Sequence, residues 1–119
     1  MVVVVLRKLM SRLNRPIHDI DREKLESFAD GAGGHALNEI APRMRIRAAG
    51  EIKTLRIVPR AGAPALEAVI SDGRGTVTAI FLGRRKIGGL AAGRKVTVQG
   101  MVVADGHRNA LFNPEYELL

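Results

Sequence analysis

Residues 88–96, Gly-Gly-Leu-Ala-Ala-Gly-Arg-Lys-Val, come closest in this sequence to a motif that does chemistry. Four residues separate Gly88 from Gly93, the glycine spacing of a phosphate-binding loop, and a lysine is close by. Such a loop needs lysine directly after its last glycine, then a hydroxyl residue for magnesium, and then a helix. Here Arg94 takes the lysine position, Val96 takes the hydroxyl position, and an alternating pattern follows. The segment is therefore predicted to be a glycine-shaped connector and not a nucleotide site.

Other patterns that carry catalysis or bind metal are also missing. His18, His35 and His107 fall in separate segments without metal-ligand spacing, and the chain has no cysteine. Asp72 lies in a Ser-Asp-Gly turn, where the backbone geometry of the turn accounts for an aspartate without acid–base chemistry. No serine has a nucleophile-elbow context. We therefore expect no catalytic residue, metal, cofactor or small-molecule substrate.

The charge distribution favours a polyanionic partner. The 119 residues carry 19 Lys and Arg against 12 Asp and Glu, a net charge of +7. Residues 43–66 have six basic and one acidic side chain, and residues 84–95 have five basic and none acidic, so each block carries +5. The apolar start, residues 1–6, is too short for a signal peptide or a membrane span. A cytoplasmic protein is expected, and a membrane role is not favoured.

Residues 1–42 are predicted to be a helical extension and linker. Leu6, Leu9, Met10 and Leu13 form one apolar stripe that ends before Pro16. This stripe is expected to pack on the protein's own domain, on a protein partner or on a second copy; lying on a membrane surface is the weaker alternative. A second helix is predicted to begin at Asp19 or Asp21, to carry Leu25, Phe28 and Ala29 on one face, and to end at Gly31.

From residue 43 the apolar period changes to two, which indicates strands. Residues 45–52 and 96–102 alternate in the same way, and each run has a glycine, Gly50 or Gly100, on its inward face. Glycine there predicts a bend or bulge that lets a barrel close. The inward parity slips after Ile52, which predicts a bulge near Lys53 and Thr54.

The remaining strands complete a five-stranded pattern. They are predicted at residues 66–70, 76–82, 96–104 and 110–116, with loops at 58–64 and 105–109 and a connector at 83–95. In the connector, Ile87 and Leu90 are expected to plug one end of the barrel. Five strands, a long bent first strand and a connector between strands three and four predict a mainly β fold, a Greek-key OB-fold barrel at residues 43–119.

A family resemblance supports this fold. Residues 69–75, 77–81, 90–100 and 113–116 resemble the OB-fold nucleic-acid-binding domains of aminoacyl-tRNA synthetases and of the wedge domain of the bacterial helicase RecG. The whole chain resembles a small stand-alone actinobacterial OB-fold protein, in which a helical segment precedes the barrel and Phe-Leu-Gly-Arg-Arg (residues 81–85) follows strand three. The resemblance implies nucleic-acid binding without a helicase motor or a synthetase catalytic domain.

The expected interface is the face of strands two and three with its flanking loops. The hypothesis is a non-enzymatic protein that holds single-stranded DNA or RNA in a basic groove, by contacts that are mostly electrostatic. The alternative is a protein-interaction module that uses the barrel and the N-terminal helix. Phe81, Phe112 and Tyr116 can either stack on bases or lie in the core. The predicted nucleic-acid-binding residues are Arg45, Arg56, Arg60, Phe81, Arg84, Arg85, Lys86, His107 and Arg108.

Overall fold

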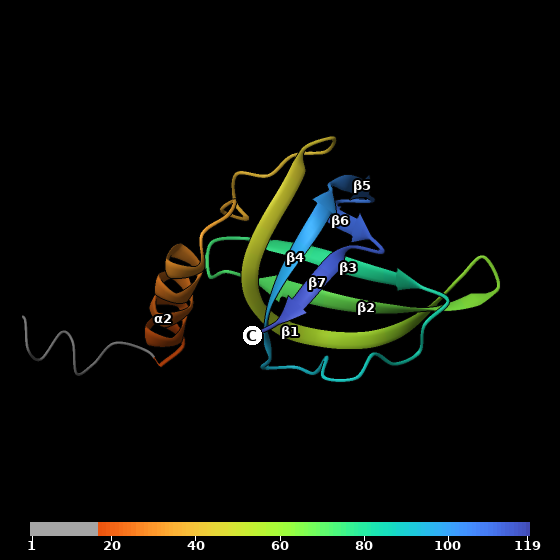
Figure 1. Cartoon of the computed structure of the whole chain (residues 1–119), viewed down its shortest axis with the longest axis horizontal. Helices are drawn as coiled ribbons and strands as arrows, with labels where there is room; N and C mark the ends of the chain where they lie inside the picture. Colours follow the sequence, from red (N-terminus) through yellow and green to blue (C-terminus); the bar gives the residue numbers. More distant parts are fainter. Residues whose placement is uncertain (1–16) are drawn as a thin grey trace, which may run out of the picture.

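The computed structural model describes residues 17–119, which form one helix and a single curled sheet (Figure 1). The stripe predicted at residues 6–13 lies outside the described residues. The elements are α2 (Ile17–Ala32), β1 (Arg45–Arg60), β2 (Ala63–Ser71), β3 (Thr76–Leu82), β4 (Lys95–Met101), β5 (Val103–Asp105), β6 (Arg108–Phe112) and β7 (Glu115–Leu118).

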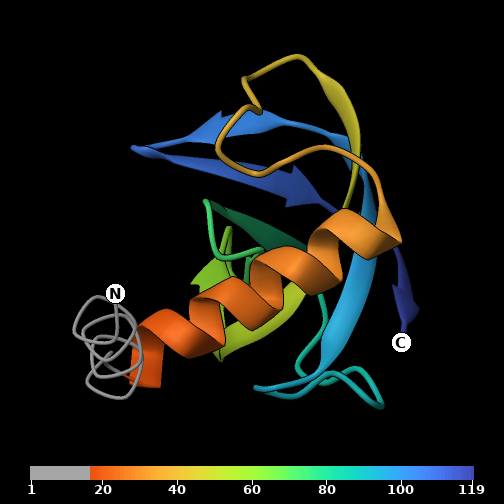
Figure 2. The same ribbon diagram turned by 90° about the vertical axis from the view of Figure 1, so that its left-hand side faces the viewer.

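The sheet has the strand order β5-β6-β3-β2-β1-β4-β7 and curls into a half-barrel. The long strand β1 pairs antiparallel with β2 along its C-terminal half and with β4 along its N-terminal half. Strand β3 pairs in parallel with β6, and β4 pairs antiparallel with β7. In Figures 1 and 2, β4 and β7 form one wall, β2 and β3 form the other, and β1 curves between them. The apolar core fills the space between the walls.

The count of five strands is wrong: the described part of the chain has seven. The predicted fourth strand breaks at Val102, whose N–H and C=O both bond the segment before β1, to Met44 O and Arg43 N, each at 2.8 Å. The predicted fifth strand breaks at Asn113, which has a φ of 48°, and at Pro114, which has no N–H to donate. Its first half, β6, pairs with β3 on one wall, and its second half, β7, pairs with β4 on the other.

The predicted bulge in β1 is confirmed. Ile52 faces Ile70 of β2, but the next paired residue is Thr54, opposite Val69, so Lys53 is left without a partner in β2. Before the bulge the even-numbered residues of β1 face the core, and after it the parity is reversed. One extra residue therefore turns the second half of β1 over and bends the strand around the barrel.

The predicted loop at residues 58–64 is a tight hairpin instead. β1 runs to Arg60 and β2 starts at Ala63, so only Ala61 and Gly62 form the turn. Their φ angles are 49° and 79°, the two positive values of a type I′ turn. This turn matches the twist of the strands, which explains why both strands continue further than the two nearby prolines suggest.

Ala61 is the strained member of this turn, because an L-residue with a side chain disfavours the left-handed region. We predict that Ala61→Asn raises the free energy of unfolding by about 0.5–1 kcal/mol, since Asn-Gly is the preferred pair in this turn. Urea unfolding followed by circular dichroism measures the change. Ala63→Asn, two residues later in β2, is the control and should lower stability, because Asn is unfavourable in a strand. Equal effects of the two substitutions would contradict the assignment of the turn.

The core draws on the sheet, the connector and the segment before β1. Ile87 and Leu90 are buried in the main core cluster, as predicted for a plug, and so are Leu37 and Ile40. Gly93, with a φ of 89°, turns the chain just before β4. Its N–H donates to Ile52 O at 2.7 Å, which fastens the connector to the bulge of β1.

Helix α2 lies across one end of the half-barrel and is anchored at the β2–β3 turn (Figure 2). Asp72 is buried there and accepts from the N–H groups of Leu37, Arg74 and Gly75 at 2.8–2.9 Å, which confirms it as a turn residue. Arg74 also donates two hydrogen bonds of 2.9 Å to Asp30 of α2. The caps of this helix were predicted wrongly. Asp19 and Asp21 lie inside it, and it ends at Ala32, just before Gly33, whose φ is 77°.

Candidate nucleic-acid interface

A buried carboxylate lies at the centre of the predicted interface. Glu67 of β2 is on the outer face, which we define as the side of β2, β3, β6 and the C-terminal half of β1 that is turned away from the core. Its side chain is only 1% exposed. Arg108 lies 2.9 Å from it and Arg60 lies 3.2 Å away, while Arg56 is further off at 3.5 Å. Glu67 is thus held by three guanidinium groups that cover it from solvent.

A second carboxylate joins the same arginines. Asp105, at the end of β5, is 2.7 Å from Arg60 and 2.8 Å from Arg108. We call Arg56, Arg60, Glu67, Asp105 and Arg108 the outer-face cluster. Its formal charge is only +1, because two carboxylates offset three arginines.

The cluster keeps both of its carboxyl groups ionised. Burial acts to raise the pKa of Glu67, but hydrogen bonds and charge from Arg108 and Arg60 outweigh it, so the pKa lies below its ordinary value. Hydrogen bonds from Arg60 and Arg108 also lower the pKa of Asp105. Both groups therefore carry full negative charge at neutral pH and compete with any phosphate for these arginines.

Strand register explains how the cluster forms. Arg56 faces Glu67 across the β1–β2 pair, and the reversed parity after the bulge puts Arg60 on the same face. Asp105 and Arg108 are partners across the β5–β6 hairpin. Sequence reasoning found the three arginines but missed both carboxylates. The pairing of Arg56 with Glu67 could have been found by centring the hairpin on Ala61 and Gly62.

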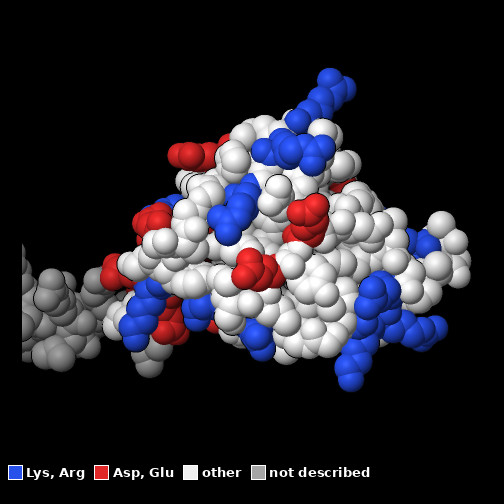
Figure 3. Space-filling view, in the orientation of Figure 1, with Lys and Arg blue, Asp and Glu red and all other residues white. Residues whose placement is uncertain are grey.

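The connector supplies cations that the cluster does not. Arg84, Arg85 and Lys86 are exposed, and within residues 17–119 none of them has an ion pair. The chain just before them is fixed: Leu82 N–H donates to the side chain of Asn113 at 2.9 Å, and Gly83 N–H donates to Pro64 O at 2.8 Å. These bonds hold the start of the connector at the edge of the outer face. Figure 3 shows the basic side chains gathered there at the lower right.

The three aromatic side chains of the sheet have different environments. Phe81 is 6% exposed in the core, 5.5 Å from Tyr116 in an edge-to-face contact, so its assignment to the interface is corrected. Its ring has no free face for a base. Phe112 of β6 is 36% exposed on the outer face, and the Arg60 guanidinium lies 5.5 Å from its ring centre. The sequence left Phe112 open, and the structure makes it the aromatic group of the outer face.

His107 and Arg45, two further residues predicted for the interface, lie in different parts of the sheet. His107 is exposed in the β5–β6 hairpin, beside Arg108, and so borders the outer face. Arg45 does not: it is on the N-terminal half of β1, opposite Met101 of β4. The bulge separates it from the other predicted residues, so its assignment to the same groove is corrected.

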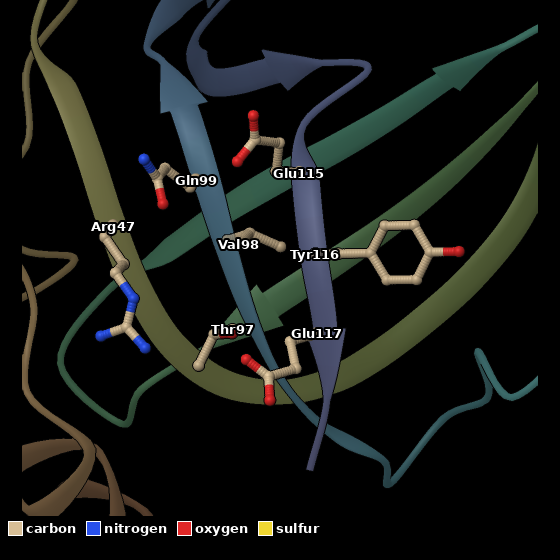
Figure 4. A pocket seen from close by; sticks show the side chains of 7 residues that line it. All are labelled: Arg47, Thr97, Val98, Gln99, Glu115, Tyr116 and Glu117. Atoms are coloured by element: carbon tan, nitrogen blue, oxygen red, sulfur yellow. The ribbon is translucent and has the colours of Figure 1, made fainter.

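A pocket on the face that carries Arg45 has an unfavourable charge for a polyanion. A pocket of about 140 Å³ on this face is lined by Arg47, Thr97, Val98, Gln99, Glu115, Tyr116 and Glu117. Figure 4 shows Arg47 on one side of it and the two glutamates on β7 on the other. One cation and two carboxylates give the pocket a charge of −1, which repels phosphate. Electrostatics therefore favours the outer face and the connector over this one.

Comparison with known proteins gives a fold but no family. No protein-family model matches this chain, and no curated protein sequence matches it. A solved structure of RecG bound to a three-way DNA junction matches with a TM-score of 0.51, at 20% identity. The match covers 81% of this chain and 14% of the RecG chain.

The two proteins share a fold. The matched region is a small part of the much longer RecG chain. Within residues 17–119, no helix is long and apolar enough to cross a membrane. No three His, Asp or Glu side chains within that range are grouped as metal ligands.

Proposed function

We propose that this protein binds nucleic acid, single strands in preference to duplex, and catalyses no reaction. The observation that carries the proposal is the group of exposed cations Arg84, Arg85 and Lys86. They have no ion pairs within the described residues 17–119 and border a face with an exposed aromatic ring. The structure of RecG on a DNA junction, which has the same fold, supports the partner class.

We further propose that the half-barrel is an OB-type Greek-key barrel of the small stand-alone kind. The strand pairing supports this: β1 pairs with both β2 and β4, and β3 pairs in parallel with a strand that follows β4. The two strand breaks divide the five expected strands into seven shorter strands. Ile87 and Leu90 of the connector between β3 and β4 are buried in the main core cluster, as expected of a connector that closes one end of such a barrel.

Each part of the interface has a distinct role in this proposal. Arg84, Arg85 and Lys86 contact the phosphate backbone, because exposed cations on long side chains can reach it and release its counterions. An unpaired base stacks on Phe112, whose ring a duplex cannot reach without unstacking. Arg60 is kept against that ring by Glu67 and Asp105, so the stacking surface is preorganised.

A fluorescence-anisotropy titration tests the proposal. We predict that a single-stranded oligonucleotide binds more tightly than the matching duplex, and that three phosphate contacts give a log–log salt slope of about −2. Arg84→Ala with Arg85→Ala should weaken binding at least tenfold at low salt. Arg45→Ala with Arg47→Ala, a control matched in residue type and charge, should change it less than threefold. Equal losses in the two variants, or no binding at low salt, would reject the proposal.

The second candidate function is protein interaction, favoured by exposed apolar side chains on the sheet. Ile57 of β1 and Tyr116 of β7 are 52% and 42% exposed. The predicted stripe at residues 6–13 would add to such a surface. If no oligonucleotide binds at low salt while a full-length sample is dimeric by light scattering, this function replaces the first.

A further inference from the structure

The cleft between α2 and the sheet gathers three lysines from three separate elements. It has a volume of about 320 Å³ and is lined by Asp21, Lys24, Leu25, Glu51, Lys53 and Lys95. A neighbouring hollow of about 250 Å³ shares Asp21, Leu25 and Lys53 and adds Arg22. The two form a continuous trough along the sheet side of α2. Nothing in the nucleic-acid proposal uses it.

Strand register and the bulge bring two of these lysines together. Lys95 faces Glu51 across the β1–β4 pair, and Lys53 lies two residues further along β1, at the bulge. Lys53 has no partner in β2, and its side chain lines the cleft. Lys53 also forms an ion pair with Glu51, so this carboxylate lies between the two lysines.

Helix α2 provides the opposite wall. The Lys95 ammonium lies 5.4 Å from the centre of the Phe28 ring, and this cation–π contact fixes it at the cleft. Lys24 of α2 lines the same space, and no ion pair involves Lys24 or Lys95 in residues 17–119. Figure 3 shows basic side chains, with acidic ones among them, around the lower part of the helix.

The charge of the trough is positive. Arg22 of the neighbouring hollow is paired with Asp19, so the charge of the cleft comes from three lysines offset by Asp21 and Glu51, which leaves +1. Each ammonium has three donors and suits phosphate as a compact point charge. Lysines that line one cleft repel one another, and a bound dianion would relieve that repulsion.

We propose that this cleft is an anion site for a phosphate-bearing group. The volume admits a phosphate with a small attached moiety, at the lower end of the range for ligand pockets. The phosphate can come from a free nucleotide or from the backbone of a nucleic acid whose path extends past the connector. The site is independent of the outer face and stands even if the proposed function fails.

The test uses the full chain with three probes: inorganic pyrophosphate, adenosine 5′-monophosphate and the single-stranded oligonucleotide. Isothermal titration calorimetry of Lys53→Gln with Lys95→Gln should show at least fivefold weaker binding of the probe that fills the cleft. Arg45→Gln with Arg47→Gln, on the face of the sheet that carries neither the cleft nor the proposed interface, is the control and should bind pyrophosphate like the parent. Melting temperatures check folding, and Lys24→Gln on the exposed helix replaces the double variant if that variant unfolds.

The results show whether the cleft binds an anion and whether the phosphate belongs to a small molecule or to a nucleic acid. Weaker pyrophosphate or nucleotide binding in the lysine variant supports a small-molecule site. Weakening of oligonucleotide binding alone supports a backbone phosphate from nucleic acid. If the lysine variant binds all three probes as the parent does, or if the parent binds none of them, the cleft is not an anion site. Failure of the outer face would instead appear as oligonucleotide binding that the Arg84 and Arg85 substitutions leave unchanged.

Discussion

Replacing Gly50 with alanine is expected to lower the free energy of unfolding by about 3 kcal/mol, and valine by more. A Cβ on Gly50 would lie 2.5 Å from the backbone oxygen of Ser71 and 2.8 Å from a methyl carbon of Ile70. The first contact is with the backbone of β2, which cannot move without disturbing its pairing. At this point β1 leaves its pairing with β4 and begins to pair with β2. The backbone of Gly50 must therefore approach the backbone of β2 closely for β1 to pair with both walls.

Gly100→Ala is the matched control for Gly50, and Gly100 is the glycine that departs from the sequence prediction. Both were predicted to be bend points, but the atom nearest to a Cβ on Gly100 is a Leu111 methyl carbon at 3.7 Å, an ordinary contact. Its substitution should therefore change stability by less than about 1 kcal/mol and in the favourable direction, since alanine has less backbone entropy to lose. Guanidinium unfolding of both variants measures the difference.

Oligonucleotide binding separates structure from function at Gly50. The residue lies before the bulge and away from the outer face, so any Gly50→Ala protein that remains folded should bind with near-parental affinity. A variant that melts like the parent but no longer binds would place Gly50 in the interface and overturn its structural role.

Replacing Glu67 with alanine is the second large expected effect, a loss of about 3 kcal/mol in the free energy of unfolding. Alanine removes the buried carboxylate and leaves Arg60 and Arg108 with only Asp105 to share. Glu67→Gln keeps the shape and some hydrogen bonds, so its loss should be smaller. It also releases positive charge on the outer face, and under the proposed function it should bind oligonucleotide more tightly than the parent.

The pH dependence of stability follows from the lowered pKa values of Glu67 and Asp105. A carboxyl group whose pKa is lowered by folding stabilises the protein at pH values above its ordinary pKa, here 4.5 and 3.8. That contribution is lost as the pH falls through the lowered folded-state values. The stability difference between the parent and Glu67→Gln should thus be constant from pH 7 to about 5 and shrink below pH 4. Chemical denaturation at pH 7, 5 and 3 measures it, and a pH-independent difference would contradict the ionised cluster.

Much of the local structure could be read from the sequence. The period-two pattern located the main strands, the parity slip located the bulge at Lys53, and glycine and apolar spacing identified the connector with Ile87 and Leu90 as its buried plug. Asp72 was recognised as a turn residue from its immediate neighbours. These features depend on residues close together in the chain, where steric limits on φ and side-chain alternation act directly.

The candidate interface depended on the tertiary structure. The sequence found the basic residues, but it could not show that Glu67 and Asp105 neutralise Arg56, Arg60 and Arg108, or that the bulge removes Arg45 to another face. Phe81 and Phe112 are both aromatic residues in or beside predicted strands, and only the packing of the two walls buries one and exposes the other. The charge and the exposure of a site depend on residues that are distant in sequence. Strand pairing decides which of these residues meet, and the local pattern does not specify that pairing.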